Sequence, residues 1–420
     1  MATVIDTGTI ASLGFPTATP ILDVLHPLPR QDSGRFTTGD YFFISSAVIV
    51  AFTELPAIRS FVDTVAHQSA LAFWTGVVIL PVVAFLAAAS LHQAGHLLGG
   101  RLTGFAAVRI KFGRLTLREN LEPTDALSLG FIVMRPDNEK QLRRRLTYLV
   151  AGGPIASLLA PLLLEAGLSL VRSRWATNNF LALAAIHLFS VFSFLLGIGS
   201  LLPDIDSRGN FSDGTRLLML LKNDFRASRW LAIVELQLGL RSGKNPQNWG
   251  EDLVARALGH KDDSFDTVAA NWLSYLWASR RQDLGQATKC LEGALTGVAP
   301  SPGHLRDRVL LEAAVFQAWY RHNLVKSQFW QSQIVDPETL SALDRQRLEI
   351  ASIWSDGRLF DAWEKLQQGL LQIRQMPDSP VRVAAERDAL EWKAQMESRM
   401  LAGAWATMHS WPYERQIQMA

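Results

Sequence analysis

Two histidines four residues apart, His92 and His96, are the strongest chemical signal in this sequence. Residues at positions i and i+4 share one face of a helix, so both imidazoles can reach a single tetrahedral zinc ion. In the H-E-x-x-H pattern of zinc proteases, the residue after the first histidine is a glutamate that takes a proton from zinc-bound water. Here that residue is Gln93, whose amide has nearly the same shape but is not a base. The five residues therefore predict a zinc protease site without its general base.

The composition limits both the class of protein and the kind of metal site. The 420 residues are 48% hydrophobic and 19% charged, and the net charge of +2 gives no reason to expect nucleic-acid binding. The single cysteine, Cys290, excludes an internal disulfide and fits a reducing compartment. It also excludes a zinc site built from cysteines. A metal ion must therefore be held by His, Asp or Glu.

Four apolar segments in the first half of the chain predict membrane helices, near residues 41–58, 69–98, 147–171 and 180–202. Spans of about 20 apolar residues match the hydrocarbon core of a bilayer. Buried helices of a large soluble protein are the alternative. The stretches 69–91 and 180–202 contain no Asp, Glu, Lys or Arg, which favours a membrane protein. The proline-containing segment 1–40 is expected to be a flexible lead-in.

Basic residues in the loops set the expected orientation. The loop between the third and fourth spans carries only Arg172 and Arg174. The loop between the second and third spans carries ten basic residues: Arg101, Arg109, Lys111, Arg114, Arg118, Arg135, Lys140, Arg143, Arg144 and Arg145. This loop is therefore expected to be cytoplasmic, and so is the tail after residue 202. The expected location is a bacterial inner or plasma membrane.

The basic loop also contains a strand pattern. Val108 and Ile110 alternate with Arg109 and Lys111, and the apolar run 131–134 could pair with them. We expect a small β-hairpin beside the membrane site. Because a strand edge can dock an extended peptide, Val108 and Ile110 are candidate substrate-binding residues. A structural hairpin without a ligand is the alternative.

The rest of the chain predicts soluble helices. An amphipathic helix over residues 216–239 runs into a connecting segment at 221–244, which precedes a helical domain at 245–420. Three helix pairs in this domain look alike, near residues 272–295, 312–334 and 348–370. In each pair the first helix carries a Trp. The second helix carries a Leu that is followed three residues later by a small residue. Spacings of 40 and 35 residues between these leucines are typical of stacked helix hairpins of the tetratricopeptide type. Such arrays bind peptides or proteins, so the tail is a candidate site for a protein partner.

A third metal ligand is expected after the last span. Asp204, Asp206 and Asp213 are all candidates by chemistry. Asp213 precedes Gly214 at the start of the next predicted helix, where a carboxylate often serves as the helix cap instead. Spacing alone leaves the choice among the three open.

Taken together, these segments resemble the site-2 protease family of intramembrane zinc metalloproteases. Members carry H-E-x-G-H, then a Gly-Pro motif on a middle membrane helix, then N-x-x-P followed by Asp-Gly. Residues 92–96 match the first motif apart from the glutamine, residues 151–157 (AGGPIAS) match the second, and residues 200–214 match the third with Ser200 in place of asparagine. The resemblance covers residues 69–220, about a third of the chain.

The resemblance implies a zinc ion (Zn²⁺) held by His92, His96 and Asp213 inside the membrane, near its cytoplasmic face. In active members, a glutamate at the position of Gln93 activates the water that attacks a peptide bond of a membrane-protein or peptide substrate. Two more positions are implied in substrate binding. Pro154 would let the middle helix approach the site closely, and Ser200 stands where an asparagine holds substrate backbone. A serine reaches less far than asparagine.

Gln93 divides the functional hypotheses. Loss of a general base costs about 10² to 10⁴ in rate, so hydrolysis by this chain is expected to be abolished. The chain is then either a natural pseudoprotease that binds membrane helices in its cleft, or an enzyme whose glutamate was replaced to trap a resting or substrate-bound state. A membrane adaptor that works through its helical tail would need no metal. A transporter is disfavoured because the four spans show no internal repeat.

The sequence thus predicts a mainly α protein: a polytopic membrane helix bundle with a small β-hairpin insert, followed by a soluble α-helical hairpin-repeat domain. Its expected parts are a flexible segment at 1–40, a membrane metalloprotease core at 41–220 with a β-rich loop at 99–146, a connecting helix at 221–244, and a cytoplasmic helical-repeat domain at 245–420.

Overall fold

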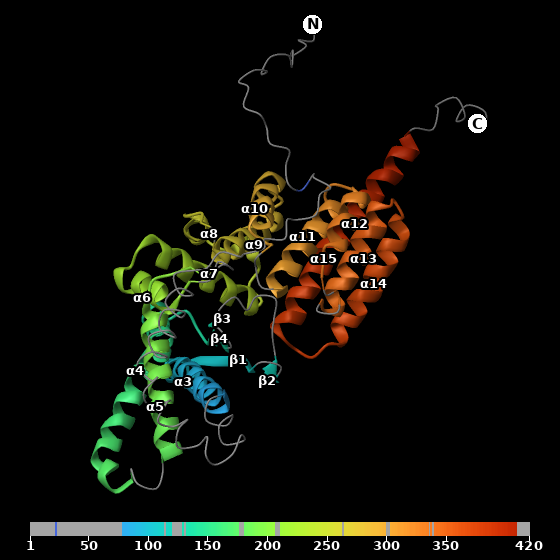
Figure 1. The fold of residues 1–420 in the computed structure, drawn as a ribbon. Helices are drawn as coiled ribbons and strands as arrows, with labels where there is room; N and C mark the ends of the chain where they lie inside the picture. Colours follow the sequence, from blue (N-terminus) through green and yellow to red (C-terminus); the bar gives the residue numbers. More distant parts are fainter. Residues whose placement is uncertain are drawn as a thin grey trace, which may run out of the picture.

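The structure is a computed structural model and is mainly helical (Figure 1). It describes Leu22 and residues 78–112, 115–119, 128–129, 132–175, 180–205, 211–262, 264–299, 303–335, 337 and 340–409. The span predicted at 41–58, the beginning of the span at 69–98, and Asp206 lie outside the described residues. The same holds for the lead-in at 1–40 apart from Leu22.

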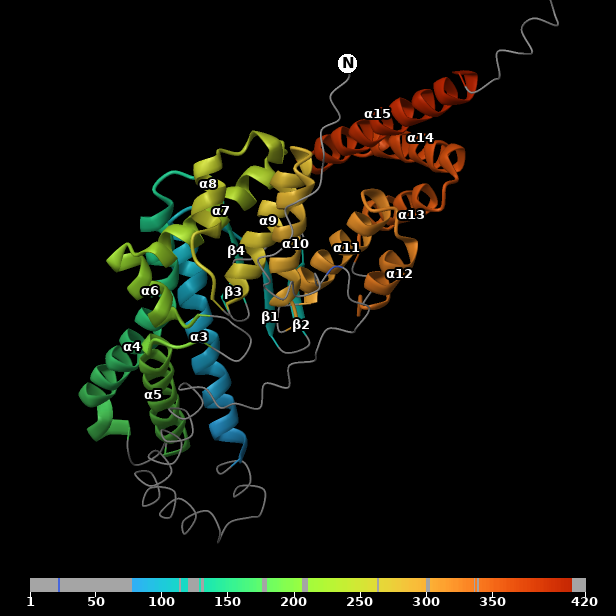
Figure 2. The same ribbon diagram turned by 90° about the horizontal axis from the view of Figure 1, so that it is seen from above.

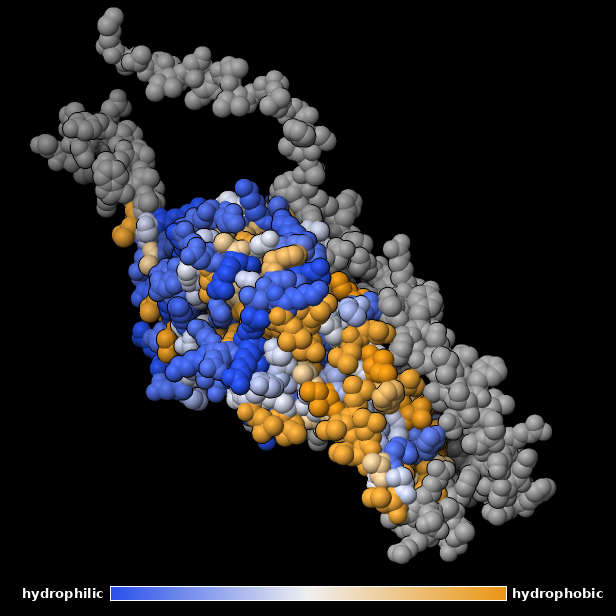
Figure 3. Space-filling model, turned by 90° about the vertical axis from the view of Figure 1, so that its left-hand side faces the viewer, coloured by the Kyte–Doolittle hydropathy of each residue, from blue (hydrophilic) through white to orange (hydrophobic). Residues whose placement is uncertain are grey.

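Three long apolar helices pack against one another at one end of the molecule (Figure 1): α3 (Leu80–Leu102), α4 (Leu142–Trp175) and α5 (Phe180–Leu201). Each is long and apolar enough to cross a membrane. Their bounds agree with three of the predicted spans. Large apolar side chains point outward from them, with Leu163 65% exposed and Leu170 85% exposed. Figure 3 shows this apolar surface beside the hydrophilic surface of the helical domain.

The β-rich loop between α3 and α4 forms a four-stranded antiparallel sheet in the order β2-β1-β4-β3. The strands are β1 (Phe105–Phe112), β2 (Leu115–Glu119), β3 (Ser128–Leu129) and β4 (Ile132–Pro136). The predicted pairing with residues 131–134 is confirmed, because Ile110 faces Ile132 and Ala107 faces Met134. The insert is therefore larger than the expected hairpin.

The sheet limits where a peptide could dock beside Val108 and Ile110, which both lie on β1. Ile110 pairs with Arg118 of β2 on one side and with Ile132 of β4 on the other, so the strand has no free edge there for β-augmentation. The side chain of Val108 is also buried. The expected role of the two residues in substrate binding stays a prediction.

The amphipathic helix expected over residues 216–239 is two helices, α6 (Asp213–Lys222) and α7 (Phe225–Arg241). The chain turns at Asn223, which adopts a left-handed conformation with φ of 53°, and the Asp224 side chain caps α7 by accepting from the Ala227 amide. Helix α7 is not an isolated connector. Trp230 joins the cluster around α4 and α6, whereas Ile233 belongs to the core of the helical domain.

The helical domain contains the three predicted helix pairs as α9–α10, α11–α12 and α13–α14. Its elements are η3 (Pro246–Asn248), α8 (Glu251–Leu258), α9 (Phe265–Arg280), α10 (Leu284–Thr296), α11 (Gly303–Trp319), α12 (Leu324–Ser332), α13 (Ala342–Ser355), α14 (Leu359–Gln375) and α15 (Pro380–His409). In each pair, a residue with positive φ lies two positions before the start of the second helix; these residues are Gln282, His322 and Gly357.

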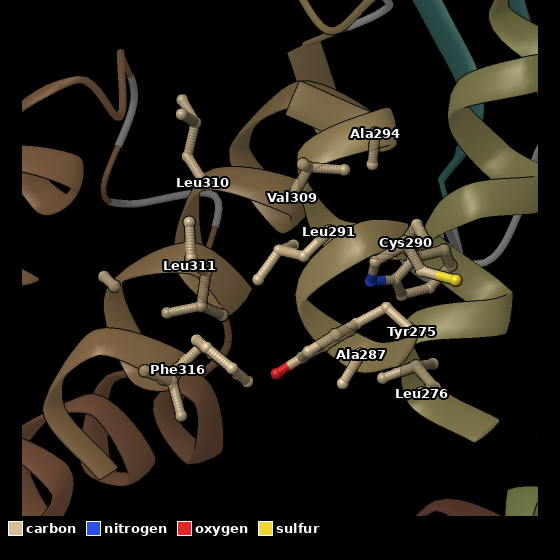
Figure 4. Packing of buried hydrophobic residues seen from close by; sticks show 14 of the residues in the cluster. Tyr275, Leu276, Ala287, Cys290, Leu291, Ala294, Val309, Leu310, Leu311 and Phe316 are labelled. Atoms are coloured by element: carbon tan, nitrogen blue, oxygen red, sulfur yellow. The ribbon is translucent and has the colours of Figure 1, made fainter. Parts of the chain in front are cut away.

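The repeated Leu-x-x-small pattern has a packing reason. Each second helix begins at the leucine, and the small residue three positions later is fully buried; these are Ala287, Ser327 and Ala362. Only a small side chain leaves room for the two helices of a pair to approach closely. Figure 4 shows how Leu291 of α10 lies between Tyr275 of α9 and Leu311 of α11.

Several tryptophans of the helical domain lie in its core. Trp272, Trp319, Trp330 and Trp354 are all buried. The ring of Trp319 stacks on that of Trp392 with a centroid distance of 3.9 Å, which ties α11 to α15. Eleven of the 13 tryptophans of the chain lie from Trp230 onward, so tryptophan fluorescence reports mainly on this domain.

Inside this core, the carboxylate of Glu312 is buried and both of its oxygens accept from Arg347, at 2.8 and 2.7 Å. Burial alone would raise the pKa of Glu312, but the charge and hydrogen bonds of Arg347 outweigh it and lower the pKa. We expect Glu312→Ala to destabilise the helical domain by about 3–5 kcal/mol, because it leaves a buried guanidinium without its partner. The measurement is urea unfolding followed by tryptophan fluorescence.

The matched control is Glu349→Ala, which removes a half-exposed ion pair with Lys365 at 2.9 Å. It should change the free energy of unfolding by about 1 kcal/mol or less. Equal effects of the two substitutions would contradict a structural role for the buried pair.

Candidate metal centre

His92 and His96 of α3 and Asp213 of α6 converge in one place. Both histidines are buried and lie on the same face of α3, as their spacing predicts. The two Nε2 atoms are 3.2 Å apart, and Asp213 Oδ2 lies 3.1 Å from Nε2 of His92 and 3.3 Å from Nε2 of His96. Among the described residues, these three are the group of His, Cys, Asp and Glu placed to hold a metal ion.

Helix α4 orients both imidazole rings. His96 Nδ1 lies 2.9 Å from the carbonyl oxygen of Leu149, and His92 Nδ1 lies 3.0 Å from Ser157 Oγ. A carbonyl only accepts, so His96 carries its proton on Nδ1 and turns the lone pair of Nε2 toward Asp213. Ser193 Oγ of α5 donates to the carbonyl of Ser157 at 3.0 Å. Such partners behind the ligands fix the tautomer and direction of metal-binding histidines.

The donor set fits a zinc ion. The lone pair of His96 Nε2 faces a carboxylate oxygen, an arrangement that is repulsive unless a proton or a cation lies between them. Bonds of about 2.0 Å in a tetrahedral zinc site place neighbouring ligand atoms about 3.3 Å apart. The observed separations of 3.1, 3.2 and 3.3 Å agree with that edge length. Two histidines and a carboxylate would leave a fourth position for water or substrate.

The structure distinguishes between the three candidate aspartates. Ser212, not Asp213, is the N-cap of α6, because its Oγ accepts from the Thr215 amide. The carboxylate of Asp213 is therefore free to face the histidines. Burial alone would raise its pKa, but the interactions with the neighbouring His92 and His96 rings outweigh this and lower the pKa to about 2. Asp204 instead accepts from the amide of Ile205.

A short loop holds Asp213 at the end of α5. Ser212 Oγ donates to the Leu202 carbonyl at 2.7 Å, and Thr215 Oγ1 donates to the Asp204 carbonyl at 3.0 Å. Gly214 allows the last step of this approach. A Cβ atom at that position would lie 1.9 Å from the carbonyl oxygen of Leu201, so a larger residue would push Asp213 away from the histidines.

The Gly-Gly-Pro motif of α4 also has a steric explanation. A Cβ atom on Gly152 would lie 2.3 Å from the carbonyl oxygen of Gly95, so α3 and α4 approach more closely here than side chains would allow. A Cβ atom on Gly153 would lie 2.3 Å from Nε2 of His96. Pro154 is buried in α4 directly after them. Its missing amide hydrogen removes one helix hydrogen bond at this point.

Two further predicted site residues have no ligand contact in the structure. Gln93 lies on α3 beside His92, and its Oε1 is buried without a hydrogen-bond partner among the described residues. Ser200 Oγ donates to the carbonyl of Gly197 in its own helix, at 3.1 Å. The expected roles of Gln93 as the general-base position and of Ser200 in substrate binding stay predictions.

Sequence reasoning missed the two groups that orient the rings. Ser157 is the last residue of the AGGPIAS motif, so its position was visible in the sequence although its role was not. The Leu149 carbonyl carries no sequence signal, because every residue has one. A comparison with known protein families, curated proteins and solved structures finds no match for this chain.

We expect Gly153→Ala to abolish metal binding, because the added methyl group would displace the His96 ring. The matched control is Gly167→Ala in the same helix, where a Cβ atom meets nothing within 4 Å. The control should retain metal and gain slightly in helix stability. Metal per chain, measured by mass spectrometry of the purified proteins, checks this. Retention of full metal content by Gly153→Ala would contradict the observed placement of His96.

Proposed function

We propose that this chain is an intramembrane zinc metallopeptidase of the site-2 protease kind, in which Gln93 occupies the position of the general base. The observation that supports it most is the convergence of His92, His96 and Asp213 from separate segments. A chance pair of histidines would not have its rings oriented from behind by another helix.

The position of the site supports a substrate within the membrane. His96 is six residues before the end of α3 at Leu102, which is about 9 Å along the helix axis. The two histidines thus lie inside a helix that is long and apolar enough to cross a bilayer, near the end that leads into the sheet. An ionisable cluster at such depth is costly and marks a functional site. Its substrates are peptide bonds in or beside the membrane helix of another protein.

The chemistry follows from the roles of the individual residues. A bound zinc ion would supply a Lewis acid that polarises the scissile carbonyl. His92 and His96 would present nitrogen ligand atoms to the ion, and Asp213 would present a carboxylate oxygen. A glutamate at position 93 would accept a proton from the attacking water and return it to the leaving amine. Gln93 keeps the shape of that side chain but cannot carry the proton, so this chain binds substrate and does not turn it over.

The surroundings fit an integral membrane protein with a cytoplasmic tail. The outward-facing apolar side chains of α3, α4 and α5 would contact lipid. Arg143 and Arg145 stand at the start of α4, where the basic loop would meet the cytoplasmic surface. A bacterial inner or plasma membrane is the proposed location, and the helical domain is proposed to bind a protein partner.

The test compares the chain with its Gln93→Glu variant. We expect equal zinc content in both proteins, and cleavage of single-span membrane substrates that is about 10² to 10⁴ faster with the variant. Zinc is counted per chain in detergent, and cleavage is followed by gel and mass spectrometry. The control is Gln93→Glu combined with His96→Ala, which should lose both zinc and cleavage.

A natural pseudoprotease is the second candidate, favoured by a ligand set that is complete without its base. Zinc in both proteins with no cleavage by either would support it and overturn the peptidase. Absence of zinc from both would overturn the metal centre itself and leave a membrane adaptor that acts through its helical domain.

A further inference from the structure

Leu22 lies in the core of the helical domain, far along the chain from the residues that surround it. It is 2% exposed and belongs to the same hydrophobic cluster as Leu311 and Trp319 of α11. Figures 1 and 2 show α11 and α12 well away from α3. A residue from before the membrane helices therefore completes the core of the domain that follows them.

The contact also includes the main chain. Gln317 stands on α11 with its side chain buried, and its Nε2 donates to the carbonyl oxygen of Leu22 at 2.8 Å. A buried amide needs a hydrogen-bond partner, and Leu22 provides it. When an extended peptide is recognised, main-chain hydrogen bonds give affinity and buried side chains give specificity, and Leu22 makes one contact of each kind.

We propose that the helical domain is a receptor for an apolar peptide segment, and that its occupant is the N-terminal segment of this same chain, anchored at Leu22. The sequence around the anchor, Pro20-Ile21-Leu22-Asp23-Val24-Leu25, is apolar apart from one aspartate. Proline at position 20 disfavours a helix that enters this segment from its N-terminal side. The occupant is covalently attached, so it competes as an intramolecular ligand with any partner of the same kind.

A cysteine pair tests the contact in the full-length protein. The only native cysteine is buried, and burial raises the pKa of the Cys290 thiol to about 11, so it reacts slowly. In a Cys290→Ala background, Leu22→Cys with Gln317→Cys should form a disulfide within one chain. Trypsin then releases the peptide ending at Arg30 joined to the peptide 309–321, which mass spectrometry identifies.

The control pairs Leu22→Cys with Phe360→Cys, an exposed position on α14 that collects random collisions. Cross-linking of the control as fast as the Gln317 pair, or no cross-linking of either pair, would overturn the proposal. A disulfide-linked band of twice the chain mass would show that the segment comes from a second copy, which would overturn docking within one chain. None of these outcomes depends on zinc or on cleavage, so they are independent of the proposed peptidase activity.

Competition tests the receptor role. A labelled synthetic peptide of residues 16–29 should bind the full-length Leu22→Asp protein at least about 10-fold more tightly than the unaltered protein, whose own segment occupies the site. Gln317→Leu in the Leu22→Asp background should weaken that binding, because the main-chain hydrogen bond is lost. Equal affinity for the unaltered and Leu22→Asp proteins would contradict occupation of the site by the chain's own segment.

Discussion

The metal centre depends on one steric constraint, the close approach of the α3 and α4 backbones at Gly95 and Gly152. Helix α3 carries both histidines, and α4 carries the two polar groups that set their direction. Helix axes packed through ordinary side chains lie about 8–10 Å apart. A Cβ atom on either glycine would lie 2.3 Å from a backbone oxygen of the facing helix, so contact at this distance requires hydrogen at both positions. The geometry of the ligands is therefore set by residues without side chains.

The third ligand is held from the other side, by the helical domain. Arg216 lies one turn after Asp213 on α6, and its buried guanidinium pairs with Asp266 of α9 at 3.7 Å and stacks over the ring of Trp230 at 4.3 Å. Arg143 of α4 donates to the carbonyl of Leu220 at the other end of α6, at 2.8 Å. Helix α6 is thus fixed at both ends, and the helical domain forms part of the framework that places Asp213.

The parts of this structure that follow from periodicity could be predicted from the sequence. Three apolar helices, the i, i+4 histidines and the three helix pairs each depend on contacts that repeat along the chain. The choice of Asp213 over Asp204 could not be derived from spacing, because it depends on which residue caps α6. That role is taken by Ser212, one position earlier. The break at Asn223 was missed for a similar reason, since an amphipathic pattern continues across a single left-handed residue.

The strand order of the sheet and the contact of Leu22 could not be predicted from the sequence, because both depend on how the chain packs in space. Alternation along residues 108–111 predicts a strand but does not say whether its edges are free, and β1 turned out to be paired on both sides. Docking of Leu22 on Gln317 joins positions 295 residues apart, and no local pattern in the sequence links them. Non-local contacts of this kind are set by the packing of the whole domain. Such contacts cannot be predicted from patterns in a single sequence.

The side chain of Gln93 is polar although its oxygen is buried. Its Oε1 is buried without a hydrogen-bond partner among the described residues, and an unsatisfied buried acceptor costs about 1–3 kcal/mol. A residue kept only for packing at this place would be expected to be apolar, because an apolar side chain avoids that cost. The three residues placed to hold a metal ion lie beside it, and the hydrogen bonds behind both histidine rings are intact. A polar side chain at position 93 therefore fits the proposed place of this residue in a metal site better than a role in packing alone.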